Sequence, residues 1–266
     1  MGPPRASGAR DGALNRRYSA AVPRPTLRSW LSEAPYTLAL SSGFFGFFAH
    51  AGVVAVLEEE EGLWPSAGCG SSAGALVMGL WGAGLPAARL REELLALRRE
   101  HFWDPWPGWG LLRGLKFRDR LESLLPVPTF DRCRWPVAFS AYDVATKRTE
   151  VLRDGPLAPA IHASCAVPLL FQPVCIGARR FLDGGVTDRH GLAATRPGER
   201  VLYHHLTSRS PWRKKDSPAL RIPAREGLRA VAIDGLPRSG PFKLHAGLAA
   251  MERAAEGMRA ALDAEP

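Results

Sequence analysis

The chain has 266 residues, of which 46% are hydrophobic and 23% charged, and its formal net charge is +9. That length can bury a sizeable core, and the composition is ordinary for a globular protein. The positive charge suits anionic partners such as lipid headgroups or nucleic acid. The four cysteines form no C-x-x-C pair, so we expect neither a disulfide framework nor a zinc site.

The first 30 residues contain six arginines and four prolines against one acidic residue, Asp11. Such a segment has little to bury, so we expect residues 1–34 to form a basic, disordered tail and residues 35–266 to form a single domain. The tail lacks the apolar region of a secretory signal. We therefore expect a cytoplasmic location, and peripheral attachment to membranes or lipid droplets is left open.

Residues 38–57 contain no Asp, Glu, Lys or Arg and are long enough to cross a membrane as one helix. Gly43 and Gly46 interrupt this stretch, however, and two serines precede them. A strand over 36–42, a tight glycine turn and a buried helix over 48–61 explain the pattern better than a membrane span does.

The rest of the chain keeps alternating between strand and helix patterns. This alternation predicts an α/β fold with a largely parallel sheet covered on both faces. We expect strands at 66–72, 179–185 and 200–208, a hairpin over 135–152, an aromatic and proline-rich loop over 101–117, and helices over 73–85, 86–100, 117–125, 157–166 and 246–262.

A short turn joins one of these strands to the helix that follows it. Gly70-Ser71-Ser72-Ala73-Gly74 matches G-x-S-x-G with Ser72 in the centre. In this motif the serine lies at the tip of a sharp turn, and Gly70 and Gly74 let the strand and the helix approach closely. The helix N-terminus favours negative charge on the serine or on an oxyanion. Ser72 is therefore the candidate nucleophile, and Ser71 is the disfavoured alternative.

A serine hydroxyl needs a base to become a good nucleophile. His204 or His205 could be that base in a Ser-Asp-His order, with Asp183 as the carboxylate. Asp183 ends an apolar strand directly before Gly184 and Gly185, a sequence that in isolation signals only a turn. The residues by themselves leave the identity of the base open.

Two separated motifs in this order resemble those of the patatin-like phospholipases. They are GCGSSAGAL around Ser72, and AIHASCAVPLLFQPVCIGARRFLDGGVTD, which contains Asp183. The resemblance covers about residues 36–206. It implies a three-layer α/β/α domain in which Ser72 and Asp183 form a catalytic dyad without histidine. It implies no cofactor, and the chain has no His-Glu-x-x-His or other metal-ligand cluster.

The family's first motif consists of three glycines, any residue, a basic residue and a glycine, and it is altered in this chain. Ser42-Gly43-Phe44-Phe45-Gly46 stands in its place. In the family the backbone N–H groups of this loop form the oxyanion hole, and backbone donors survive the replacement of side chains. The resemblance therefore places the oxyanion hole at Gly43 and Phe44, with Gly46 completing the turn.

The implied reaction is hydrolysis of a lipid or phospholipid ester, by attack of Ser72 and proton transfer to Asp183. An aspartate with a pKa of about 4 is a weak base, so we expect the site to be desolvated. The phenylalanines beside Gly43 suit both that need and an acyl chain.

Other classes of function stay open on the sequence. One is a nonenzymatic lipid- or membrane-binding protein, and another is a Ser-His-Asp esterase or acyltransferase. A nucleic-acid partner is not expected, because no recognised motif accompanies the charge. Trp103, Trp106 and Trp109 could either fold over the core or reach a lipid interface. The second possibility predicts contact with an anionic membrane surface.

Overall fold

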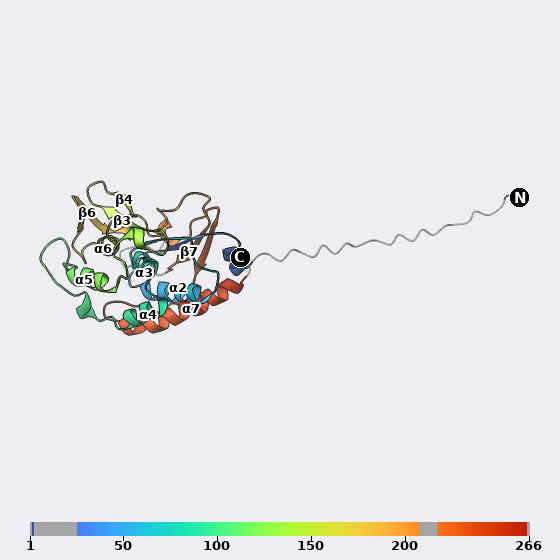
Figure 1. The fold of residues 1–266 in the computed structure, drawn as a ribbon, viewed down its shortest axis with the longest axis horizontal. Coiled ribbons are helices and arrows are strands. Elements are labelled where there is room, and N and C mark those ends of the chain that lie inside the picture. The colour runs from blue at the N-terminus through green and yellow to red at the C-terminus, as the bar shows by residue number, and fades with distance from the viewer. Residues whose placement is uncertain (1, 3–25, 208–216, 265–266) are drawn as a thin grey trace.

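One sheet of eight strands organises the computed structural model, which describes residues 2, 26–207 and 217–264 (Figure 1). The strands are β1 (Thr37–Leu40), β2 (Ala67–Ser71), β3 (Val137–Asp143), β4 (Arg148–Leu152), β5 (Val174–Ile176), β6 (Arg179–Asp183), β7 (Val201–His205) and β8 (Leu228–Ala232). Their order is β5-β6-β3-β2-β1-β7-β8, and β4 pairs with β3. β3, β2, β1, β7 and β8 run parallel, whereas β4, β5 and β6 pair antiparallel. The predicted α/β fold with a largely parallel sheet is confirmed.

The antiparallel strands decide where the two candidate site residues meet. β4 pairs with residues 139–143 along one edge of β3. A strand has only two edges, so β2 and β6 must share the other one, where β2 pairs with residues 137–140 and β6 with residues 141–143. β2 is parallel to β3 and β6 is antiparallel, so their carboxyl ends face each other on this edge.

The helices are α1 (Leu27–Glu33), α2 (Phe47–Glu59), α3 (Ala73–Gly82), α4 (Ala87–Leu95), α5 (Leu115–Leu124), α6 (Leu157–Cys165) and α7 (Gly247–Asp263). α2 packs against α3, α4 and α7 and is buried over most of its length. Gly52 permits the close approach of α7, since a Cβ there would lie 2.2 Å from the carbonyl oxygen of Met251. Residues 38–57 thus form the predicted strand, turn and buried helix. In the described ranges no helix has both the length and the hydropathy needed to cross a membrane.

The two faces of the sheet are covered differently. Leu38 and Leu40 point into the main core, which they share with residues of the helices. The opposite face carries a smaller cluster that includes Cys69 and Tyr203, and Leu192 packs on it from the segment after β6. Within the described residues this cluster draws only on strands and coil.

The folded part of the chain begins earlier than the predicted boundary after residue 34. α1 buries Leu27, Trp30 and Leu31, and the side chain of Thr26 caps it by accepting a hydrogen bond from the Ser29 backbone. The boundary prediction was wrong because this short apolar pattern follows directly on the Arg- and Pro-rich segment. Residues 3–25, the rest of the predicted tail, lie outside the described residues. β5 and β8 are two further short elements that the patterns did not predict.

Candidate active site

Ser72 lies between the end of β2 and the start of α3, in a backbone conformation with φ 53° and ψ −118°. Few residues other than glycine adopt such angles, and a conformation of this kind costs about 1–3 kcal/mol. The two flanking glycines make the turn possible. A Cβ at Gly70 would lie 2.5 Å from the carbonyl carbon of Gly74, and a Cβ at Gly74 would lie 2.0 Å from the carbonyl oxygen of Leu40.

The structure brings Ser72 and Asp183 into direct contact. Ser72 Oγ donates a hydrogen bond of 2.6 Å to Oδ2 of Asp183. Ser72 follows the last residue of β2 and Asp183 is the last residue of β6, so the contact results from the two strand ends that face each other beside β3. Both side chains are buried.

The surroundings of Asp183 make its carboxylate a stronger base than an exposed one. Burial raises the pKa of Asp183 to about 6, while the hydrogen bonds it accepts from Ser72 and from the Gly185 amide favour the charged form. The Gly185 amide donates to Oδ1 at 2.7 Å. Space after the aspartate is tight, because a Cβ at Gly184 would lie 2.1 Å from the Ser140 carbonyl oxygen. Glycine, which has no Cβ, therefore fits directly after the base.

A second serine holds the backbone of Ser72. The Ser72 amide donates to Oγ of Ser164 at 2.9 Å, and that hydroxyl donates to the Ser140 carbonyl oxygen at 2.7 Å. The thiol of Cys165 donates to the Ser72 carbonyl oxygen at 3.2 Å. Ser164 leaves no signal of this role in the sequence, because it lies inside a helix pattern.

The loop predicted as the oxyanion hole forms a tight turn beside Ser72. The Gly46 amide donates to the Gly43 carbonyl oxygen at 2.9 Å, and the left-handed conformation in this turn falls on Phe45, with φ 55°, and not on either glycine. The glycines instead leave room for a neighbouring side chain. A Cβ at Gly43 or Gly46 would lie 2.4 or 2.2 Å from Cδ1 of Leu206. Gly43 and Phe44 line the same cavity as Ser72.

Arg189 fixes this loop to the rest of the site, although no motif marked it. Its guanidinium donates from Nη1 to the Ser42 carbonyl oxygen at 3.0 Å and from Nη2 to the Leu206 carbonyl oxygen at 2.8 Å. The Ser42 amide in turn donates to the Arg189 carbonyl oxygen at 2.7 Å. Arg189 is only 5% exposed and lies six residues after Asp183. It thus connects the segment that carries the base with the residue preceding Gly43.

The alternative site residues take no part in the contact between Ser72 and Asp183. Ser71 is fully buried, and its hydroxyl has no hydrogen-bond partner among the described residues. His204 is fully buried and its Nδ1 lies 2.8 Å from Nδ1 of His50. His205 contacts the Tyr203 hydroxyl through Nδ1 at 2.8 Å. Among the described hydrogen bonds, none joins a histidine to Ser72 or Asp183, so the geometry favours a dyad over a triad.

An apolar cavity of about 170 Å³ opens beside Ser72. Its wall combines the altered glycine loop with α3, α4, α5 and the segment after α6. Residues that line it include Phe44, Phe45, Phe47, Leu76, Leu80, Leu90, Leu94, Leu121, Leu170 and Phe171. Such a wall suits a hydrocarbon chain whose polar end reaches the serine.

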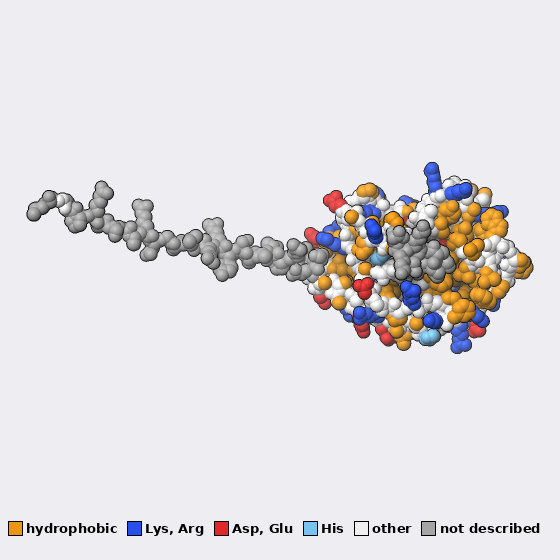
Figure 2. All heavy atoms as spheres, turned by 180° about the vertical axis from the view of Figure 1, so that it is seen from behind, with side chains coloured by type: hydrophobic (Ala, Val, Ile, Leu, Met, Phe, Trp, Pro, Cys, Tyr) orange, Lys and Arg blue, Asp and Glu red, His pale blue; other side chains and the backbone are white. Residues whose placement is uncertain are grey.

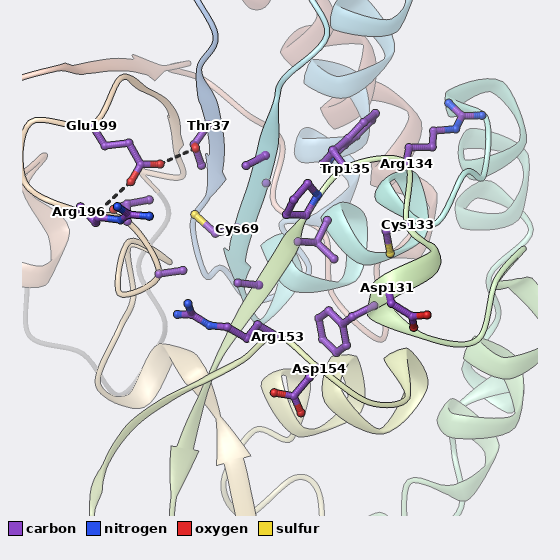
Figure 3. Close-up of a pocket in the computed structure, with 18 of the residues that line it drawn as sticks. Thr37, Cys69, Asp131, Cys133, Arg134, Trp135, Arg153, Asp154, Arg196 and Glu199 are labelled. Carbon is purple, nitrogen blue, oxygen red and sulfur yellow. Dashed lines mark hydrogen bonds between the residues drawn. The ribbon is translucent and has the colours of Figure 1, made fainter.

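A larger hollow of about 950 Å³ lies at the other end of the strands, near the start of β1, β2 and β3 (Figure 3). It contains neither Ser72 nor Asp183. Its carboxylate at Glu199 accepts hydrogen bonds from the Thr37 hydroxyl at 2.6 Å and from the Arg196 amide at 2.8 Å. In parallel sheets ligands bind at the carboxyl ends of strands, which is the end that carries Ser72.

Within the described residues, no three His, Cys, Asp or Glu side chains gather as metal ligands would. Near Ser72 the described residues offer a hydroxyl, a carboxylate and backbone amides for chemistry.

Comparisons with known proteins agree with the resemblance seen in the two sequence motifs. The family model for patatin-like phospholipases matches residues 38–195, more than half of the chain. Uncharacterized NTE family proteins of Mycobacterium bovis and Mycobacterium tuberculosis are 31% identical over 172 residues, which cover 63% of this chain and 48% of each relative. This chain thus spans about half the length of the curated relatives it matches. The crystal structure of VipD from Legionella pneumophila is similar in fold, with a TM-score of 0.52 and 13% identity over 87% of this chain and 67% of that one.

Proposed function

Since the chain belongs to the patatin-like phospholipase family, we propose that it hydrolyses carboxylic esters of lipids, with Ser72 as the nucleophile and Asp183 as the general base. The observation that carries this proposal is the hydrogen bond of 2.6 Å between Ser72 Oγ and Asp183 Oδ2. It joins a strained serine to a desolvated carboxylate at the edge of an apolar cavity. The nucleophile and its base are thereby within reach of each other before substrate binds.

The reaction has two halves. Ser72 Oγ forms a bond to the ester carbonyl carbon while its proton passes to Oδ2 of Asp183. The tetrahedral oxyanion accepts hydrogen bonds from the amides of Gly43 and Phe44, and from the Ala73 amide at the free N-terminus of α3. Collapse breaks the bond to the alcohol, which leaves with the proton from Asp183. Water then repeats the attack on the acyl carbon, Asp183 takes its proton, and the acid departs as Ser72 regains its hydrogen.

The cavity supports a lipid acyl group as the substrate. A buried cavity of about 150 Å³ holds a group as large as benzene, so the cavity of about 170 Å³ beside Ser72 takes roughly six carbons of an acyl chain. Longer chains must continue toward the opening. We therefore expect the rate to rise with acyl length over the first several carbons and then to level off.

The test is covalent labelling followed by turnover. A fluorophosphonate probe should modify the protein at Ser72, located by peptide mass spectrometry, and the protein should hydrolyse soluble esters of increasing acyl length. Ser72→Ala should abolish both, while Ser71→Ala, which alters a buried hydroxyl one residue away, should retain labelling. Binding of lipid without labelling or turnover would replace this proposal with the nonenzymatic lipid-binding alternative.

A further inference from the structure

Five large apolar side chains are exposed on two loops and a nearby segment at one end of the molecule. Figure 2 shows hydrophobic side chains gathered toward the end that carries α5 and the loop preceding it in Figure 1. The exposed fractions are 83% for Leu169, 75% for Phe242 and 65% for Trp109. We call these residues the apolar platform: Trp106, Trp109, Leu111, Leu169 and Phe242.

The backbone under the apolar platform is fixed. The loop after α4 pairs with the segment after α6, because the Leu111 amide donates to the Leu169 carbonyl oxygen at 3.0 Å. The side chain of Gln172 completes the attachment. Its Oε1 accepts from the Trp109 amide at 2.9 Å, and its Nε2 donates to the Gly110 carbonyl oxygen at 2.5 Å. These hydrogen bonds fix the backbone that carries Trp109, Leu111 and Leu169, so these exposed side chains lie on an ordered surface.

Leu169 adds a cost that burial inside the protein does not offset. Its φ is 68°, in the left-handed region that leucine seldom occupies, and its side chain points almost entirely into solvent. Strain of this kind at an exposed residue commonly accompanies a binding role. An apolar surface that covers Leu169 would remove this side chain from water, and the free energy gained would offset the cost of its strained backbone.

The apolar platform is continuous with the cavity that contains Ser72. Leu170 and Phe171, directly after Leu169, line that cavity, and so do Trp103 and Pro241. A lipid held against the apolar platform thus lies next to residues that line this cavity.

Cationic side chains surround the same surface. The guanidinium of Arg113 lies 4.8 Å from the ring centre of Trp106, and that of Arg99 lies 5.6 Å from the ring centre of Phe242. Neither arginine forms an ion pair within the described residues. The Asp104 carboxylate, which lies nearby in the chain, accepts hydrogen bonds from backbone amides of α5 and the residue before it. The charge around the apolar platform is therefore available for anions.

We propose that the apolar platform inserts into the headgroup boundary of an anionic lipid bilayer, with Arg99 and Arg113 at the headgroups. The substrate role of this bilayer rests on the proposed ester hydrolysis, whereas the docking itself does not. Amphipathic rings and basic side chains are favoured at such a boundary. A second copy of the chain fits less well, because a symmetric contact through this surface would bring like charges together.

The experiment uses the full chain and vesicles of phosphatidylcholine, with and without phosphatidylserine. Vesicle flotation measures affinity, and a soluble short-chain ester measures catalysis separately. Leu169→Asn removes the apolar group and suits the left-handed backbone, and Trp109→Ser removes a ring. Each should lower vesicle affinity by about tenfold and leave hydrolysis of the soluble ester unchanged. Arg113→Gln should weaken binding to anionic vesicles by about fivefold.

The matched control is Ile222→Ser, which removes an apolar side chain of 43% exposure outside the apolar platform and should change neither readout. If all platform variants bind vesicles as tightly as the wild type does, the docking proposal is wrong. Hydrolysis of the soluble ester would still support the proposed function in that case. If the wild type binds no vesicles but forms dimers that Trp109→Ser dissociates, the surface is a contact with a second copy of the chain. Platform-dependent binding by a protein that cleaves no ester supports docking and defeats only the proposed function.

Discussion

Ser72 Oγ and Asp183 Oδ2 are 2.6 Å apart although 111 residues separate them in the chain. They meet because β2 and β6 end face to face on the same edge of β3. Neither the hydroxyl nor the carboxylate is needed to hold those strands together, since backbone pairing with β3 does that. Substitutions at the two residues should therefore report on chemistry and local strain, and not on loss of the fold.

Asp183→Asn should abolish ester hydrolysis, with a loss of a thousandfold or more, roughly the scale seen when a member of a catalytic triad is removed. An amide keeps the shape of the side chain but cannot accept the serine proton. His205→Gln should retain most activity, because His205 contacts Tyr203 and not Asp183. Steady-state kinetics on a soluble ester checks both variants. A larger loss in His205→Gln than in Asp183→Asn would favour a histidine base.

The pH dependence of kcat/KM should follow the ionisation of Asp183. Burial raises the pKa of this carboxyl to about 6, and only the ionised form can take a proton from Ser72. Activity should therefore rise with pH through about 6 and level off above it. A pH profile of the free enzyme on a soluble ester measures this, and activity that is already at its maximum near pH 4 would contradict the assignment.

The same pKa has a consequence for stability. Because the folded-state pKa of Asp183 lies above the value of about 3.9 in an unfolded chain, the folded state binds the extra proton between those two pH values. The contribution to stability is present below pH 4 and is lost as the pH rises through about 6. The loss at pH 8 is about 3 kcal/mol at most.

Asp183→Asn carries no charge to bury, so it should unfold at a higher temperature than the wild type at pH 8, and at nearly the same temperature at pH 4. Thermal melts at the two pH values give the comparison. Equal stabilisation by the substitution at both pH values would show that the buried charge is not the cause.

Ser72 and Asp183 could be picked out from the sequence because their local requirements leave a pattern, whereas their pairing as a dyad followed only from the family resemblance. The turn at Ser72 needs glycines at fixed offsets, and Asp183 needs small residues after it, so both leave a pattern in the chain. Arg189 leaves none, because the described hydrogen bonds of its guanidinium go to backbone carbonyl groups, which any residue provides. The helix around Trp30 was missed because seven residues make only about two helical turns. So short an apolar pattern is a weak signal beside the Arg- and Pro-rich composition of the preceding segment.

The altered glycine loop shows a second kind of feature that sequence patterns could not predict. The sequence led us to expect glycine wherever the turn is tightest, yet the left-handed residue is Phe45. Gly43 and Gly46 instead leave room for the side chain of Leu206, which follows β7 and is distant in the sequence. A tertiary contact of this kind cannot be inferred from local spacing.

The strained backbone of Ser72 leads to a prediction about two inactive variants. Glycine adopts φ near 53° without penalty, whereas alanine retains the clash of its Cβ. Ser72→Gly should therefore be more stable than Ser72→Ala, by about 1 kcal/mol. Urea unfolding of both proteins provides the measurement. Lower stability of Ser72→Gly would indicate that the surrounding contacts, and not the serine residue, carry the strain.

Arg189 provides the last prediction, because its guanidinium holds Ser42 immediately before the proposed oxyanion donors. Arg189→Met removes both hydrogen bonds to backbone carbonyl groups and lets the loop shift. Since those amides act mainly in the transition state, kcat should fall by roughly a hundredfold while KM changes little. Arg189→Lys should recover only part of kcat, because one ammonium cannot reproduce the forked donation to Ser42 and Leu206. Kinetics on a soluble ester, with thermal melts to verify folding, decides the matter, and Arg221→Met, a change at an exposed arginine, is the control. A folded Arg189→Met protein with wild-type kcat would show that the position of this loop does not limit the reaction.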